Sequence, residues 1–156
     1  MSHYKRINNE IPELQKFYRK ITVTYESENP INIMLYDPLS KKLPKTLEFQ
    51  ISKDYPFTPP KIYRNNSIYL KSLPHITIEK YRKEIKKPFG FVGNCIHCDF
   101  IIKDNWSPAI SIKHVLLEME KIEELRQIIY QDKCLQKIGI KFNIPKEITD
   151  MIHSFI

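Results

Sequence analysis

Hydrophobic and polar side chains alternate along three short stretches in the first third of the chain. Residues 21–25, 31–36 and 47–51 place a β-branched, aliphatic or aromatic side chain at every second position. A period of two residues predicts strands that each have one buried face. The separators are short and carry Asn, Asp and Pro. An antiparallel meander is therefore expected, with residues 61–64 as a fourth, shorter strand.

A second pattern, with hydrophobic residues three or four positions apart, predicts helices. Residues 4–14 form the first, in which Pro12 either kinks the helix or starts a second piece that reaches about Tyr18. Ser111 can cap a long helix that runs to about Gln131 or beyond, and Pro145 can start a short last helix. The stripe of the long helix consists of Ile112, Val115, Leu116, Met119, Ile122, Leu125, Ile128 and Ile129.

Two segments between the strands and the long helix have patterns of their own. Residues 55–60 contain three prolines and must be irregular. Residues 73–93 are interpreted as an insertion that carries a basic helix, which Pro88 and Gly90 end. The expected fold is α+β: a four-stranded antiparallel meander with an N-terminal helix, a long central helix and a short C-terminal helix, forming one domain over residues 1–156.

Composition narrows the classes of function. With 156 residues and 42 % hydrophobic content, the chain is long and apolar enough to fold as one domain. It shows no signal-like or membrane-length apolar run, so no membrane association is expected, and the expected location is the cytoplasm, with the nucleus as a second compartment. The net charge of +7 favours acidic partners. No specific nucleic-acid motif is present, and phosphate-binding glycine loops are absent.

The cysteines supply the candidate chemistry. Cys98 lies eight positions before Trp106, and a thiol is the strongest side-chain nucleophile near neutral pH. Cys95 and Cys98 form a C-x-x-C pair. A redox dithiol would need a βαβ context, and a zinc site would need further ligands such as His97 or His114. Without a second C-x-x-C or H-x-x-x-H pair, no metal is expected.

Four segments resemble the ubiquitin-conjugating enzymes, over roughly residues 4–120. They are the start of the first helix, Tyr4-Lys5-Arg6-Ile7 with Glu10-Ile11; the segment Asp54-Tyr55-Pro56-Phe57-Thr58-Pro59-Pro60-Lys61-Ile62; Ile68-Tyr69; and Lys103-Asp104 with Trp106-Ser107-Pro108-Ala109. The distance from Cys98 to Trp106 is also the family's. The resemblance implies an enzyme that carries ubiquitin or a ubiquitin-like protein as a thioester on Cys98 and transfers it to a substrate lysine or a ligase cysteine.

The resemblance also implies partners. Phe57, Pro108 and Ala109 fall at positions where the family contacts RING and HECT ligases, and Lys5 and Arg6 fall on the face that meets the ubiquitin-activating enzyme. Exposed loops and a solvated basic helix would explain the same residues without any partner. The activating enzyme uses ATP, so this chain itself needs no cofactor.

The chain departs from the family pattern at the family's His-Pro-Asn motif, whose Asn steadies the oxyanion. Leu70-Lys71-Ser72 stands in its place, and Ser72, Asn94 and His75 are the candidates to replace the Asn. The other departures are the 73–93 insertion and a shortened C-terminal region. Two alternatives stay open: a catalytically inactive ubiquitin-conjugating-like binding module, and an enzyme that transfers only to ligase cysteines.

Overall fold

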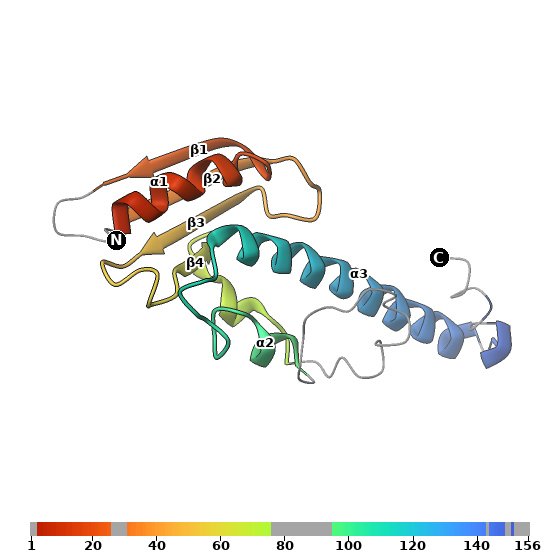
Figure 1. Cartoon of the computed structure of the whole chain (residues 1–156). Helices are drawn as coiled ribbons and strands as arrows, with labels where there is room; N and C mark the ends of the chain where they lie inside the picture. Colours follow the sequence, from red (N-terminus) through yellow and green to blue (C-terminus); the bar gives the residue numbers. More distant parts are fainter. Residues whose placement is uncertain (1–2, 26–30, 76–94, 143, 149–150, 152–156) are drawn as a thin grey trace. The chain divides into compact units, whose positions relative to one another are not determined.

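The structure is a computed structural model that describes residues 3–25, 31–75, 95–142, 144–148 and 151 (Figure 1). The chain divides into two compact units, Met1–Lys121 and Ile122–Ile156. The single domain over residues 1–156 stays a prediction. The elements follow in the order α1 (His3–Leu14), β1 (Tyr18–Thr24), β2 (Ile31–Pro38), β3 (Thr46–Ile51), β4 (Lys61–Arg64), β5 (Ser67–Ile68), η1 (Tyr69–Ser72), α2 (Ile96–Asp99) and α3 (Ile112–Phe142).

The first unit is built on an antiparallel sheet in the order β1-β2-β3-β4-β5. The predicted alternation is confirmed, because Ile33 on β2 pairs with Phe49 on β3, which in turn pairs with Ile62 on β4. All three side chains are buried on one face of the sheet. The meander, the α+β class and the fourth strand at residues 61–64 are therefore confirmed.

The expected strand count of four is wrong, since β5 adds a fifth strand. Its two residues pair with the end of β4, with Arg64 opposite Ser67. Asn65 and Asn66 connect the strands with φ values of 50° and 61°. Two successive left-handed residues form the tight turn that suits a two-residue hairpin, and Asn tolerates this conformation better than most residues. A two-residue strand is too short for alternation to reveal.

Helix α1 ends at Leu14, so the predicted second helical piece reaching about Tyr18 is wrong. Pro12 lies inside the last turn of the helix. A turn follows, and the chain enters β1 at Tyr18, whose side chain is buried and whose hydroxyl donates to the carbonyl of Pro44 at 2.8 Å. Burial of Tyr18 in the sheet outweighs the weak helical preference of the residues after Pro12.

A buried carboxylate holds α1 to the rest of the unit. Glu10 is only 6 % exposed. Its carboxylate accepts hydrogen bonds from Arg6 Nε at 2.6 Å, the Tyr55 hydroxyl at 2.7 Å and the backbone N–H of Ile112 at 2.9 Å. The guanidinium of Arg6 also donates to the carbonyl of Ile110 at 3.2 Å. Glu10 thus connects α1 to the loop after β3 and to the first turn of α3.

Helix α3 confirms the predicted long helix and its stripe. Ile112, Val115, Leu116 and Met119 are fully buried in the first unit.

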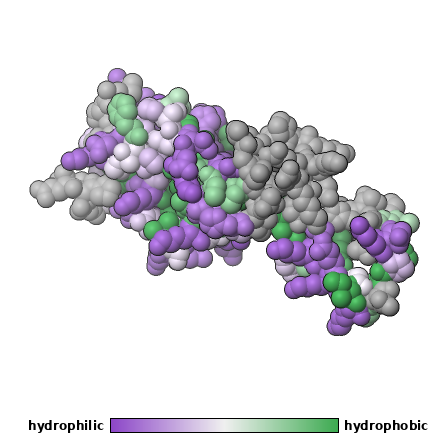
Figure 2. Space-filling model, turned by 90° about the horizontal axis from the view of Figure 1, so that it is seen from below, coloured by the Kyte–Doolittle hydropathy of each residue, from purple (hydrophilic) through white to green (hydrophobic). Residues whose placement is uncertain are grey.

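Among the described residues, no helix combines the length and apolarity that a membrane crossing needs. Figure 2 shows a mostly hydrophilic surface, with hydrophobic atoms near the end of α3. The exposed apolar side chains of that end include Ile140 and Phe142.

Two predicted helices include residues that the structure does not describe. The basic helix of the 73–93 insertion lies outside the described residues from residue 76 onward. Of the helix predicted from Pro145, residues 146–148 and 151 are helical. The backbone N–H of Ile148 donates to the carbonyl of Pro145 at 3.1 Å.

We predict that Glu10→Ala destabilises the protein strongly. The substitution removes the acceptor of Arg6 Nε, of the Tyr55 hydroxyl and of the backbone N–H of Ile112. A buried donor left without an acceptor typically costs about 1–3 kcal/mol of unfolding free energy, and the half-buried Arg6 loses its ion pair as well. Urea denaturation measures the loss. Glu13→Ala is the matched control on the same helix, because Glu13 bonds Lys16 and Lys113 at the surface. Equal losses in the two variants would contradict the role given to Glu10.

Candidate functional site

Cys98 lies on a short helix that two buried side chains hold in place. Helix α2 has 4 residues, and Ile96 within it and Phe100 directly after it are both fully buried. The ring of Phe100 packs on the ring of Tyr69 in η1, with 5.7 Å between centroids. The thiol of Cys98 itself remains half-buried. Apolar anchoring on both sides thus holds a partly accessible thiol at a defined place.

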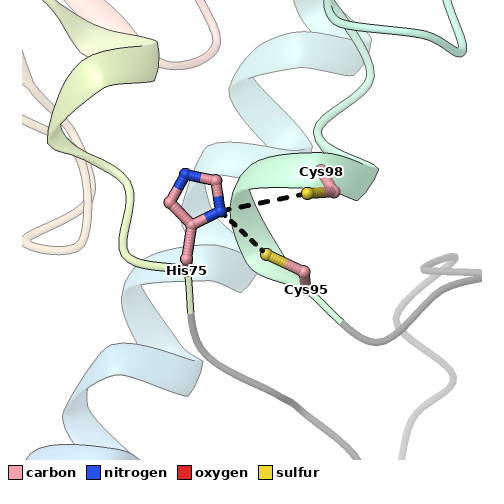
Figure 3. A group of neighbouring side chains, drawn as sticks. All are labelled: His75, Cys95 and Cys98. Carbon is pink, nitrogen blue, oxygen red and sulfur yellow. Dashed lines mark hydrogen bonds between the residues drawn. The ribbon is translucent and has the colours of Figure 1, made fainter.

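The structure brings a histidine and two cysteines together at this place. The Nδ1 atom of His75 lies 3.6 Å from the sulfur of Cys95 and 4.0 Å from the sulfur of Cys98. Figure 3 shows both sulfurs facing the same ring nitrogen, while the other ring nitrogen points away. The ligand atoms of all three residues lie within 4.8 Å of one another. His75 was proposed from the sequence only as a replacement for an oxyanion donor.

The electrostatics of the cluster follow from this crowding. The hydrogen bond with Cys95, together with desolvation and the charge of Cys95, raises the pKa of the Cys98 thiol, while Lys103 acts in the opposite direction. Desolvation, followed by the nearby His75 and Lys103, lowers the pKa of His97. The ring of His97 lies against that of His75 at 4.0 Å between centroids. The imidazole of His75 is therefore packed as well as hydrogen-bonded.

Two segments that lie far apart in the sequence meet at Trp106. Its indole N–H donates to the carbonyl of Pro56 at 2.8 Å, and its ring lies 6.1 Å from the ring of Tyr55. The loop after β3 is thereby joined to the segment that leads from α2 into α3. Tyr55 also donates to Glu10. A chain of contacts therefore runs from Trp106 through Tyr55 to the buried carboxylate on α1.

The sequence-predicted contact residues are mostly exposed. Phe57 is 79 % exposed, an unusual value for a large aromatic side chain. Pro108, Ala109 and Lys5 are exposed too. Arg6 is half-buried, because its guanidinium bonds Glu10 and the carbonyl of Ile110. Arg6 thus has a structural role whether or not it meets a partner.

The candidates for oxyanion support differ in their hydrogen-bond partners. The hydroxyl of Ser72 donates to the carbonyl of Tyr69 at 2.6 Å, so its proton is already engaged within η1. Asn94 lies outside the described residues. His75 is directed at the sulfurs of Cys95 and Cys98. His114, named as a further zinc ligand, instead bonds Ser111 at the start of α3.

Glu118 on α3 holds the segment that follows Cys98. One oxygen of its carboxylate accepts the backbone N–H of Ile101 at 3.0 Å. Burial raises the pKa of Glu118 to about 7, although the hydrogen bond from Ile101 acts against this shift. Sequence patterns did not single this residue out, because a glutamate on a long charged helix is ordinarily solvated. Its position is a consequence of the chain folding back after α2.

Comparison with solved structures gives a weak likeness to a putative ubiquitin conjugating enzyme. No family model matches the chain. The structure described as "Crystal structure of a putative ubiquitin conjugating enzyme from Plasmodium yoelii" is 22 % identical, with a TM-score of 0.43, over 80 % of this chain and 73 % of that chain. A likeness of this degree does not assign the chain to a family.

We predict that Glu118→Gln changes the pH dependence of stability. Between the ordinary pKa of about 4.5 and the folded value of about 7, the folded state holds a proton that the unfolded state releases. The stability that this proton provides is full below pH 4.5 and is lost as pH rises through 7. The neutral amide does not titrate. Its unfolding free energy relative to the wild type should therefore rise from pH 5 to pH 8, by on the order of 2 kcal/mol.

Urea denaturation at several pH values measures this difference. A difference that stays constant over the range would contradict the raised pKa of Glu118.

Proposed function

We propose that the protein is a conjugating enzyme that carries ubiquitin or a ubiquitin-like protein as a thioester on Cys98. The observation that carries the proposal is the bond from Trp106 to Pro56 at 2.8 Å. It joins the two segments that most resemble the ubiquitin-conjugating enzymes, residues 54–62 and 103–109. Cys98 lies on the helix that precedes the second of them, with its thiol partly accessible.

The surroundings of Cys98 support an acyl-transfer step. The thiol of Cys98 gives its proton to a base, and the resulting thiolate sulfur attacks the thioester carbonyl that joins the modifier to the activating enzyme. A new carbon–sulfur bond forms, the old one breaks, and the departing thiolate takes up a proton. Among the described residues, the imidazole of His75 is a base close to this thiol, with its Nδ1 4.0 Å from the sulfur of Cys98. A base at this place can accept the thiol proton as the attack begins.

The exposed residues near this frame support a ligase-binding face. Phe57 follows Pro56, and Pro108 and Ala109 follow Trp106, so the bond between Trp106 and Pro56 links the two loops that carry them. An aromatic side chain that is 79 % exposed on a proline-rich loop can bury its ring against a partner at low entropic cost. Lys5 is exposed on α1 and is proposed to meet the activating enzyme.

A charging assay tests the proposal. The protein is mixed with activating enzyme, ATP, Mg²⁺ and ubiquitin in the presence of a chelator that binds zinc far more tightly than magnesium, and a reducible adduct is sought on a non-reducing gel. We expect an adduct with the wild type and with Cys95→Ala, and none with Cys98→Ala. Cys134→Ala controls for loss of a thiol elsewhere in the chain.

The outcome also separates the alternatives. An adduct that persists in Cys98→Ala would reject Cys98 as the carrier. Absence of an adduct with ubiquitin and with each ubiquitin-like protein tested would favour the non-catalytic binding module. An adduct that discharges to a ligase cysteine but never to free lysine would favour the enzyme restricted to ligase cysteines. The bond from the Ser72 hydroxyl to the carbonyl of Tyr69 supports this alternative, because it engages the proton that would stabilise the oxyanion.

We further predict that Phe57→Ala weakens ligase-stimulated discharge by about 10-fold or more while charging stays unchanged, because truncation of a central aromatic contact costs about 1.4 kcal/mol or more of binding energy. Single-turnover discharge of the preformed thioester with a RING ligase measures this effect. Leu39→Ala, at another exposed apolar side chain, serves as the control. A slower charging step in Phe57→Ala would instead indicate damage to the fold or to the activating-enzyme contact.

A further inference from the structure

We propose that His75 Nδ1, Cys95 Sγ and Cys98 Sγ form a binding site for a divalent metal ion of the zinc type. The three ligand atoms lie within 4.8 Å of one another and face a common point (Figure 3). The site is an inference from the folded chain, because the sequence alone shows only half of it. Metal binding does not depend on the function proposed above.

The distances match a tetrahedral ion. With metal–sulfur bonds of about 2.3 Å and metal–nitrogen bonds of about 2.0–2.1 Å, tetrahedral angles place sulfur and nitrogen about 3.6 Å apart. The observed separations are 3.6 Å from His75 to Cys95 and 4.0 Å from His75 to Cys98. The two observed separations are therefore close to those that a single tetrahedral ion requires.

The ligand set selects the class of ion. Two thiolates and one imidazole are soft or borderline donors, which zinc accepts and which magnesium and calcium avoid. Each thiol releases a proton on binding, so the two sulfurs cancel the charge of the ion and the site is neutral overall. Three protein ligands leave the fourth position of a tetrahedron open to water or to another exchangeable ligand.

The fold of the backbone positions the three ligand side chains before any ion binds. Cys95 is extended and immediately precedes α2, and its carbonyl accepts the N–H of Asp99 at 3.0 Å. This turn projects both sulfurs of the C-x-x-C pair toward His75. Packing against His97 holds the ring of His75. His75 is exposed and the two cysteines are half-buried, so an ion can reach the site from solvent.

Occupation of the site has a consequence that rests on the proposed function. The same sulfur of Cys98 cannot carry an acyl group while it is bound to a metal ion. Binding would therefore protect the thiol and hold the enzyme in an uncharged state until the ion is removed.

Cobalt(II) serves as the probe for the test. The full-length protein, reduced and stripped of metal, is titrated with Co²⁺ without oxygen. We expect the visible bands of tetrahedral cobalt together with near-ultraviolet charge-transfer absorption from thiolate, both abolished by addition of Zn²⁺. Cys95→Ser and His75→Ala should each weaken binding by more than about 100-fold, since loss of even an outer partner of a metal ligand typically costs 10–100-fold.

Cys134→Ser and His114→Ala are the matched controls and should bind as the wild type does. Far-ultraviolet circular dichroism shows whether each variant folds. If His75→Ala fails to fold, the more conservative Cys95→Ser still tests the site. Absence of thiolate charge-transfer bands in the wild type would overturn the proposal. So would equal binding by Cys95→Ser and Cys134→Ser.

Alkylation gives a second readout that needs neither modifier nor activating enzyme. Iodoacetamide labelling followed by peptide mass spectrometry should show that Zn²⁺ protects Cys95 and Cys98 but not Cys134, and that a chelator reverses the protection. Protection of all three cysteines alike, or of none, would count against the site. Metal binding without charging would reject the proposed function alone, and charging without metal binding would reject the site alone.

Discussion

The carboxylate of Glu10 is the interaction on which the arrangement of the first unit depends. It receives hydrogen bonds from Arg6 on its own helix, from Tyr55 in the loop after β3 and from the first N–H of α3. A buried carboxylate is costly to desolvate and is tolerated only when its oxygens are well paired. Its position at the N-terminus of a long helix adds a favourable interaction with the helix dipole. One side chain therefore sets where three separate segments meet.

The position of Cys98 depends on the contacts that converge on Glu10. Tyr55 is held by Glu10 and lies against Trp106, and Trp106 bonds the carbonyl of Pro56. The chain between Trp106 and α2 is short, and Glu118 fixes it at Ile101. Cys98 thus belongs to a four-residue helix whose following segment is held by Glu118 on α3 and by the bond from Trp106 to Pro56. A short helix has little stability of its own, so tertiary contacts must define the position of the thiol.

Sequence patterns were sufficient where one physical signal dominated. Alternation located the strands because β2 and β3 each bury one face, and the stripe from Ile112 onward located α3. The patterns failed where a contact from elsewhere decides the outcome. The hairpin at Asn65 and Asn66 depends on backbone conformation rather than on hydrophobicity. The contacts of Glu10 with Tyr55 and of Glu118 with Ile101 join segments far apart in the sequence, so helical periodicity cannot predict them. The partnership of His75 with Cys95 spans twenty residues and exists only after folding.

That last partnership bears directly on the chemistry of the cysteine pair. A thiol that acts only as an acyl carrier needs an accessible sulfur and a nearby base, and Cys98 with His75 would satisfy both needs. Cys95 is superfluous for that purpose, yet its sulfur lies closer to His75 Nδ1 than that of Cys98 does, at 3.6 Å against 4.0 Å. Two sulfurs directed at one imidazole nitrogen instead match the requirements of a divalent ion, whose charge two thiolates neutralise. Because a sulfur that shares its electron pair with a metal is no longer free to attack a thioester, the two uses of Cys98 exclude each other. Under the metal site proposed above, Cys95 would make the state of Cys98 depend on the metal ions around the protein.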